Sequence, residues 1–363
     1  MIEFDRKELK RALSIVGLGA DQKNTIPILE CCQIIADEQG CTIRGTNLDF
    51  DVTVKVQATF AQPQEIIVTR ARLDLICEAA GERVSVEDDG KAIRLHCGKM
   101  KLKAERYSPS RYPQVREGAL LDAGTIDGLI LSDLLATHAG ASAVDSRYAL
   151  HNVLLSKEAN KIEAAATNSH QLFLASISNQ SLEDFSVLVP APAASKLRSV
   201  LAGHPYRLEV HSAESNQKFI RVTDTETKDV FVINCGSGQF PNYQMVLPPK
   251  MPLLHASIEP LRESARLGMN FYSSRKAGNR LDIDSASCRI VARSDNNELE
   301  IEAEEIGLLE CGLKAFDPAY VGKIFQWMDG EIRIGIYDSM LIAIAETERG
   351  VSHQSYLQGM RTE

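Results

Sequence analysis

The stretch L-E-C-C-Q-I at residues 29–34 runs on to T-N at residues 46–47, and it decides how the chain is organised. A similar stretch, L-H-N-V-L-L at residues 150–155, runs on to T-N at residues 167–168. Corresponding positions of the two copies lie 121 residues apart. Each copy predicts two short strands around a polar turn, so the chain contains a long internal repeat.

Helical patterns also repeat along the chain. Each predicted unit opens with a helix, and alternating strands follow its second helix. The second helices each end at a glycine, a favourable C-terminal cap, and they span residues 71–81, 193–203 and 317–330. The fold class is therefore α+β, with three similar domains predicted at residues 1–117, 118–248 and 249–363.

The composition is that of an ordinary globular protein. The 363 residues carry 40 Lys and Arg against 49 Asp and Glu, a formal net charge of −9, and 44% of them are hydrophobic. This length fits two or three domains. The acidic balance argues against a wholly basic surface for nucleic acid, but it allows a local basic stripe.

Missing patterns exclude several classes of protein and site. No apolar run approaches the length of a membrane-spanning helix, and residues 1–5 do not resemble a signal peptide. The eight cysteines are scattered without a C-x-x-C pair, which predicts buried thiols in a reduced, cytoplasmic chain and no zinc site. Phosphate-loop, H-E-x-x-H and G-x-S-x-G motifs are missing, so no catalytic residue, metal or cofactor is predicted.

Five short motifs, in order along the whole chain, resemble those of the bacterial β sliding clamps. T-I-P-I-L at residues 25–29 is similar to the early T-L-P-I-L motif, and R-Y-A-L at 147–150 is similar to R-Y-Y-L. A-T-N-S-H-Q-L at 166–172 resembles A-T-D-G-H-R-L, and F-P-N-Y at 240–243 resembles F-P-D-Y. The segment G-M-R at 359–361 resembles the family's terminal P-M-R.

The resemblance implies a homodimer of two chains joined head to tail in a closed ring. Helices would line the hole and sheets would form the outside. Such a ring is a processivity factor without catalytic activity, which encircles duplex DNA and tethers the replicative DNA polymerase, the clamp loader and repair proteins. The net charge of −9 fits this function, because encirclement does not require many tight phosphate contacts.

Basic residues on the predicted inner helices are the candidates for DNA contact. Lys23 matches a DNA-contacting arginine of the family, and Arg147 and Tyr148 lie in a matched loop, whereas the other candidates rest on helix-face reasoning. A solvated face without a role is the alternative for each of these. The full set is Arg6, Lys10, Arg11, Lys23, Arg72, Arg147, Tyr148, Lys196, Arg198, Arg262 and Arg266.

A pocket for apolar partner peptides is implied between the second and third domains. Its candidate residues are Leu150, Thr167, His170, Leu172, Pro241, Val246, Tyr320, Met360 and Arg361. Ordinary core packing is the alternative for the leucines and the valine. Asn168, Ser169 and Gln171 depart from the family's D, G and R, and Gln358-Gly359 departs from its M-P, so peptide preference is expected to differ.

The predicted subunit contact joins two strands of opposite charge. Lys99 and Lys101 alternate along one strand face in the first domain, and a run of glutamates alternates along another in the third. Opposed edge strands with such charges would set the orientation of the two chains. A solvated acidic edge is the alternative. The candidate residues are Lys99, Lys101, Met269, Phe271, Glu298, Glu300, Glu302 and Glu304.

Two rival functions stay open from the sequence. A diverged clamp paralogue would act as an interaction platform with altered partners. An enzyme acting on nucleic acid would use acidic pairs such as Asp49 with Asp51 or Asp282 with Asp284. These pairs are more simply read as solvated strand faces, because no complete catalytic constellation accompanies them.

Overall fold

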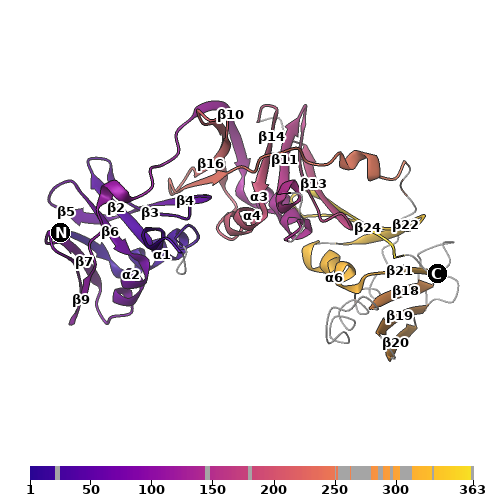
Figure 1. The fold of residues 1–363 in the computed structure, drawn as a ribbon, viewed down its shortest axis with the longest axis horizontal. Helices are drawn as coiled ribbons and strands as arrows, with labels where there is room; N and C mark the ends of the chain where they lie inside the picture. The colour runs from indigo at the N-terminus through magenta and orange to yellow at the C-terminus, as the bar shows by residue number, and fades with distance from the viewer. Residues whose placement is uncertain are drawn as a thin grey trace. The chain divides into compact units, whose positions relative to one another are not determined.

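The computed structural model of the chain contains two compact units built mainly from antiparallel sheets (Figure 1). The first unit comprises Met1–Leu129, Ser181–Glu183 and Ser199–Cys235, and the second comprises Ile130–Gln180, Asp184–Arg198 and Gly236–Glu363. The structure describes residues 1–20, 25–143, 148–178, 182–249, 251, 262, 279–284, 289–294, 297–302, 313–328 and 331–360. The α+β class is confirmed, and the predicted boundaries near residues 117 and 248 stay predictions.

Two sheets make up the framework of the first unit. One has the strand order β5-β1-β7-β8-β9, with bounds Ala58–Phe60, Ile2–Asp5, Arg83–Asp88, Ile93–Cys97 and Met100–Ala104. The other has the order β10-β15-β16-β17-β4-β3-β2-β6, with bounds Ala119–Asp127, Pro205–Ser212, Lys218–Asp224, Val230–Asn234, Phe50–Val56, Gly40–Thr46, Cys31–Asp37 and Gln64–Thr69.

The eight-stranded sheet depends on one pairing between distant parts of the chain. Strand β4 pairs antiparallel with β17, so that Asp51 lies opposite Val232 and Thr53 lies opposite Val230. Four strands from the first third of the chain thereby continue into four strands from the second third.

Helices α1 (Arg6–Val16) and α2 (Arg70–Cys77) pack against each other in the first unit. The Asp5 side chain accepts hydrogen bonds from two backbone N–H groups of the first turn of α1, at 2.9 and 3.0 Å. The sequence D-R-K-E at residues 5–8 has the pattern of such an N-terminal cap. Helix α1 also lies close to strand β3, because a Cβ atom on Gly45 would come within 2.7 Å of the Val16 carbonyl oxygen.

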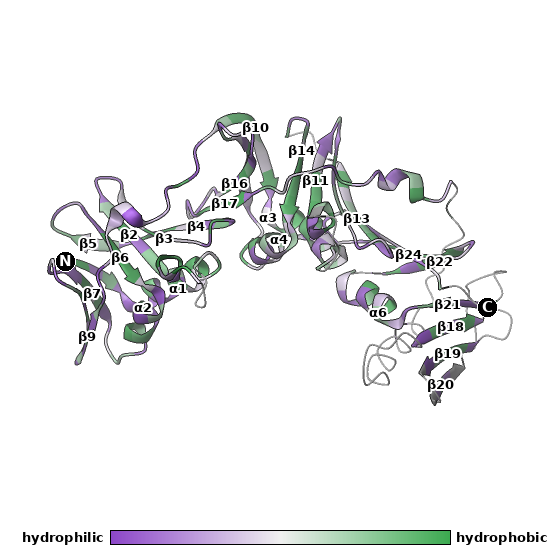
Figure 2. Ribbon diagram, in the orientation of Figure 1, coloured by the Kyte–Doolittle hydropathy of each residue, from purple (hydrophilic) through white to green (hydrophobic). Residues whose placement is uncertain are grey.

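The second unit contains a seven-stranded and a four-stranded sheet, both antiparallel. The larger has the order β14-β11-β12-β13-β24-β23-β22, with bounds Phe185–Pro190, Asn152–Glu158, Lys161–Thr167, Gln171–Ser178, Ser352–Gln358, Met340–Glu346 and Arg333–Tyr337. The smaller has the order β20-β19-β18-β21, with bounds Asn297–Glu302, Arg289–Ser294, Arg280–Asp284 and Leu313–Phe316. Figure 2 shows hydrophobic residues concentrated along strands such as β11.

The remaining helices in the described part of the chain are short. The α-helices are α3 (Gly128–Leu135), α4 (Ala191–Arg198) and α6 (Pro318–Trp327). The 3-10 helices are η1 (Pro27–Glu30), η2 (Pro109–Arg111), η3 (Ala136–Gly140), η4 (Tyr148–His151) and η5 (Tyr243–Val246). The core of the second unit stacks the Trp327 ring between Phe173 and His353, with centroid distances of 4.2 and 4.9 Å.

The repeat predicted from the sequence extends to the register of the strands. In the first copy Ile34 pairs with Ile43, and 121 residues later Leu155 pairs with Ala164. The third strand follows the same shift, because β2 pairs with β6 as β11 pairs with β14. We refer to residues 29–69 as the first repeat and to residues 150–190 as the second repeat.

The predicted glycine caps of the second helices are wrong. Helices α2 and α4 end several residues before Gly81 and Gly203, and α6 ends at Trp327, where Met328 follows as the C-cap. The last carbonyl group of α2, that of Cys77, instead accepts a hydrogen bond from a side chain of the N-terminal helix, as described below.

Candidate DNA, peptide and subunit surfaces

Arg6 serves as a cap for another helix. Its guanidinium donates from Nη1 to the Cys77 carbonyl at 3.0 Å and from Nε to the Gly81 carbonyl at 2.6 Å. Cations at a helix C-terminus satisfy the last carbonyl groups and the helix dipole. The sequence predicts Arg6 as a DNA contact, and the structure shows that Arg6 also caps the C-terminus of α2.

Lys10 and Arg11 lie exposed on α1, but carboxylates pair with both of them. Lys10 Nζ lies 2.7 Å from a Glu78 oxygen, and the Lys10 hydrogen bond lowers the pKa of Glu78. Arg11 binds Glu8 with two hydrogen bonds of 2.9 and 3.1 Å, and it lies 3.8 Å from Asp229. This helix surface is therefore partly neutralised by its own acidic residues.

The other described candidates for DNA contact have different surroundings. Arg72 is exposed on α2. Lys196 and Arg198 are half-buried on α4, and Arg198 donates from Nε to the Ser132 carbonyl at 2.9 Å. Arg262 is exposed and lies over the Phe325 ring at 5.6 Å. Four candidates have side chains outside the described residues: Lys23, Arg147, Tyr148 and Arg266.

A cavity of about 230 Å³ gathers most of the predicted peptide-pocket residues in the second unit. Six of them line it: Leu150, Thr167, His170, Leu172, Pro241 and Val246. The structure adds lining residues that were not among these candidates: Ser169, Gln171, Asn242, Tyr243, Met340, Tyr356 and Gln358. Three of these, Met340, Tyr356 and Gln358, come from strands β23 and β24, so their proximity depends on sheet pairing.

The remaining pocket candidates lie near this cavity or outside the described residues. The Tyr320 ring stacks on His170 at 5.8 Å between centroids. Met360 is half-buried and donates its backbone N–H to the Ala315 carbonyl at 2.8 Å. Arg361 lies outside the described residues.

The lining of the cavity is largely apolar. Its described lining contains no Lys, Arg, Asp or Glu, and the Tyr243 hydroxyl donates a hydrogen bond to Glu163, which is not part of the lining. Burial, followed by that hydrogen bond, raises the pKa of Tyr243, and burial raises the pKa of Tyr356 to about 12. Both phenols stay neutral at physiological pH, so the site suits uncharged, apolar ligand groups.

Strand β9 carries the predicted basic contact at one edge of its sheet. Among the described strands it pairs with β8 alone, and the exposed Lys101 lies opposite His96. Lys99 is exposed in the turn before the strand, and Lys103 adds a further exposed cation on the side of Lys101.

Strand β20 carries the predicted acidic contact, also at a sheet edge. Glu298 and Glu300 are exposed, but Arg293 and Arg289 of the neighbouring strand pair with them. Glu302 lies on the same strand, opposite Arg289, but its side chain is outside the described part of the structure. The other candidates outside the described residues are Met269, Phe271 and Glu304. The sequence did not predict that Arg289 and Arg293 pair with these glutamates. The strand register that places them opposite each other cannot be read from the sequence.

No cluster of three metal-ligating side chains occurs within the described part of the chain. Among the same residues, no helix is long and apolar enough to cross a membrane.

Comparison with known proteins relates the chain to DNA polymerase III beta subunits. A family model described as "DNA polymerase III beta subunit, N-terminal domain" matches residues 2–116. The β sliding clamp of Pseudomonas putida is 25% identical and aligns with 98% of this chain and 97% of its own length. The β sliding clamp of Proteus mirabilis is 24% identical over 95% of this chain and 89% of its own.

The chain is similar to bacterial β sliding clamps along nearly its whole length. Solved clamps share its fold: that of Pseudomonas aeruginosa bound to griselimycin has a TM-score of 0.84, 21% identity and coverage of 99% and 100% of the two chains. The β subunit of Streptococcus pyogenes has a TM-score of 0.86, 18% identity and the same coverage. These neighbours confirm the predicted clamp fold, and the clamp relatives favour a clamp over a diverged interaction platform.

Proposed function

We propose that the chain is a DNA sliding clamp. Two chains form a closed ring that encircles duplex DNA without reading its sequence and holds a replicative DNA polymerase at its template. The observation that carries this proposal is the alignment with β sliding clamps along 98% of the chain. The ring acts by topology and not by catalysis, so it functions as an accessory subunit in the cytoplasm, where the DNA is copied.

The proposed DNA surface is the set of cations on the helices of the clamp domains. Lys10, Arg11 and Arg72 are the exposed members of this set on α1 and α2. Partial pairing with carboxylates fits a ring that slides, because tight phosphate contacts would retard movement along the duplex.

The proposed partner site is the cavity lined by Leu150, Leu172 and Val246. Its neutral, apolar lining suits the apolar anchors of short peptides from the polymerase, the clamp loader and repair proteins. The proposed subunit contact pairs the basic edge strand β9 of one chain with the acidic edge strand β20 of the next.

Retention on circular DNA tests the proposal. Purified clamp is loaded onto a nicked circular duplex with a bacterial clamp loader, and retention is measured by gel filtration before and after linearisation. A topological ring stays on the circle in high salt and slides off the linear product. Equal retention on both forms would show ordinary electrostatic binding and contradict the proposal.

A further inference from the structure

The turn that supports the peptide pocket exists twice in the chain. In the second repeat, Thr167 Oγ1 accepts a hydrogen bond from the Ser169 N–H at 3.2 Å, and Ser169 has a positive φ of 76°. In the first repeat, Thr46 Oγ1 accepts from the Leu48 N–H at 3.0 Å, and Leu48 has a φ of 77°. Two non-glycine residues in this rare conformation show that the two turns share one backbone geometry.

The surroundings of the two turns match as well. The side chains of Asn47 and Asn168 each accept hydrogen bonds from the backbone N–H groups two and three residues later. The strand after each turn then pairs with a strand from a later part of the chain, so that Asp51 lies opposite Val232 as Leu172 lies opposite Tyr356. The first repeat therefore contains the scaffold of a second peptide pocket.

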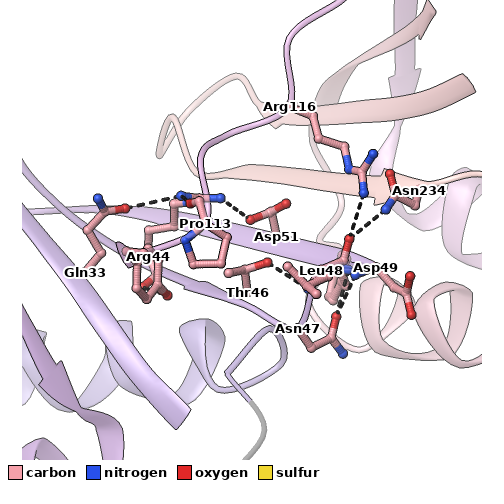
Figure 3. A network of polar contacts seen from close by, with 12 residues as sticks. Gln33, Arg44, Thr46, Asn47, Leu48, Asp49, Asp51, Pro113, Arg116 and Asn234 are labelled. Atoms are coloured by element: carbon pink, nitrogen blue, oxygen red, sulfur yellow. Dashed lines mark hydrogen bonds and ion pairs between the residues drawn. The ribbon is translucent and has the colours of Figure 1, made fainter. Parts of the chain in front are cut away.

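A buried ion pair fills this scaffold in the first repeat. Figure 3 shows the Arg44 guanidinium bridging the Asp51 carboxylate and the Pro113 carbonyl, each at 2.5 Å, with Gln33 Oε1 at 3.3 Å. Arg44 and Asp51 are 3% and 5% exposed. The guanidinium also lies over the buried Tyr112 ring at 5.5 Å.

The second repeat has small or apolar residues where the first has this network. Counted 121 residues later, Arg44 becomes Ala165 and Asp51 becomes Leu172. Both belong to the apolar cluster beside the cavity, and Leu172 lines the cavity itself. An aromatic residue precedes a proline after each repeat, at Tyr112-Pro113 and at Phe240-Pro241. Pro241 lines the cavity, whereas the Pro113 carbonyl binds Arg44.

We propose that the Arg44–Asp51 ion pair closes the first-repeat counterpart of the pocket, so that each chain takes up a single apolar peptide. This inference rests on the proposed peptide site in the second repeat. Arg44 and Asp51 thereby determine where partners dock on this clamp, although neither touches the partner. The alanine and leucine of the second repeat leave the same scaffold open.

The experiment transfers the second-repeat residues into the first repeat. Isothermal titration calorimetry measures the stoichiometry of a short synthetic peptide with leucine and phenylalanine anchors. We expect one peptide per wild-type chain and two per chain of the Arg44→Ala/Asp51→Leu variant. A folded variant that still binds one peptide per chain would overturn the inference, whereas a wild-type chain that binds none would contradict the proposed peptide site instead.

A matched control removes an exposed ion pair in the same unit. Arg207 Nε lies 2.9 Å from Glu209 on strand β15, and the Arg207→Ala/Glu209→Leu variant introduces the same residue types without opening the scaffold. It should bind one peptide per chain. Two peptides on this control would attribute the added binding to a surface leucine and overturn the inference.

A measurement on the wild-type chain keeps the inference testable if the double variant does not fold. Hydrogen–deuterium exchange is recorded with and without the peptide. The peptide should protect the turn at residues 167–172 and leave the exchange at residues 46–51 unchanged. Equal protection of both turns would show an open first-repeat site and overturn the inference.

Discussion

At the scale of single residues, the most consequential contact is the buried ion pair of Arg44 and Asp51. Two charges taken out of water are tolerated because each satisfies the other and because the guanidinium has further acceptors. Removal of one partner leaves an uncompensated charge in a site closed to water. Removal of both leaves a packing defect and takes a donor from Gln33 and the Pro113 carbonyl, but it leaves no buried charge.

Stability measurements on variants of this pair test that reasoning. Arg44→Ala should lower the free energy of unfolding of the first unit by about 3–5 kcal/mol, because Asp51 stays buried without its partner. Arg44→Ala/Asp51→Leu should lose less, since no buried charge remains. Urea denaturation followed by circular dichroism gives both values. A double variant less stable than Arg44→Ala would contradict this account.

A second residue-scale prediction concerns the pH dependence of stability. His204 Nε2 lies 2.9 Å from Asp224, and this hydrogen bond raises the pKa of His204 above 6.5. The stabilisation is therefore fully present below pH 6.5 and is lost as the pH rises through the higher pKa of the folded state. Thermal melts of wild type and His204→Gln should differ most in acid and converge in alkali. A gap that widens with pH would contradict the predicted sign.

At the scale of helices and strands, the sequence predicts the features that depend on residues close together in the chain. The Asp5 cap, the paired hairpins and the 121-residue register could all be read from the sequence. The end of α2 could not, because Arg6 caps it from another helix, about 70 residues earlier in the chain. The pocket follows the same division: its turn residues lie in one motif, whereas Met340 and Tyr356 arrive through strand pairing.

The α1 surface leads to a prediction about DNA affinity. Glu78→Gln frees Lys10 for phosphate contact, so binding to a labelled linear duplex at low salt should tighten about two- to fivefold, the range expected for losing one surface ion pair. Fluorescence anisotropy across a salt series measures the change, which should fade as salt rises.

Two further variants separate local pairing from overall charge. Glu38→Gln removes the same charge from the exposed β2–β3 turn and should have little effect. Glu78→Gln in a Lys10→Gln background should also change nothing, because the lysine through which it acts is missing. Equal tightening in all three comparisons would attribute the effect to net charge alone.

At the scale of the whole molecule, the proposed ring requires two chains. Light scattering coupled to size-exclusion chromatography should give twice the chain mass of 40.0 kDa. Charge reversal at Lys101 and Lys103 should shift the particle toward monomer, because both cations lie on the edge strand β9. A persistent monomer of the wild-type chain at micromolar concentration would contradict the closed dimer.

The pairing of β4 with β17 has a consequence for how the chain folds as it is synthesised. The β2–β3–β4 hairpins close over short loops, but the partner of β4 is nearly 180 residues further along. Contacts of such long sequence separation form slowly, since a large loop must close first. During synthesis, strand β4 therefore stays an unpaired sheet edge until residues 230–234 emerge from the ribosome, and the nascent chain is most exposed to misassociation in that interval.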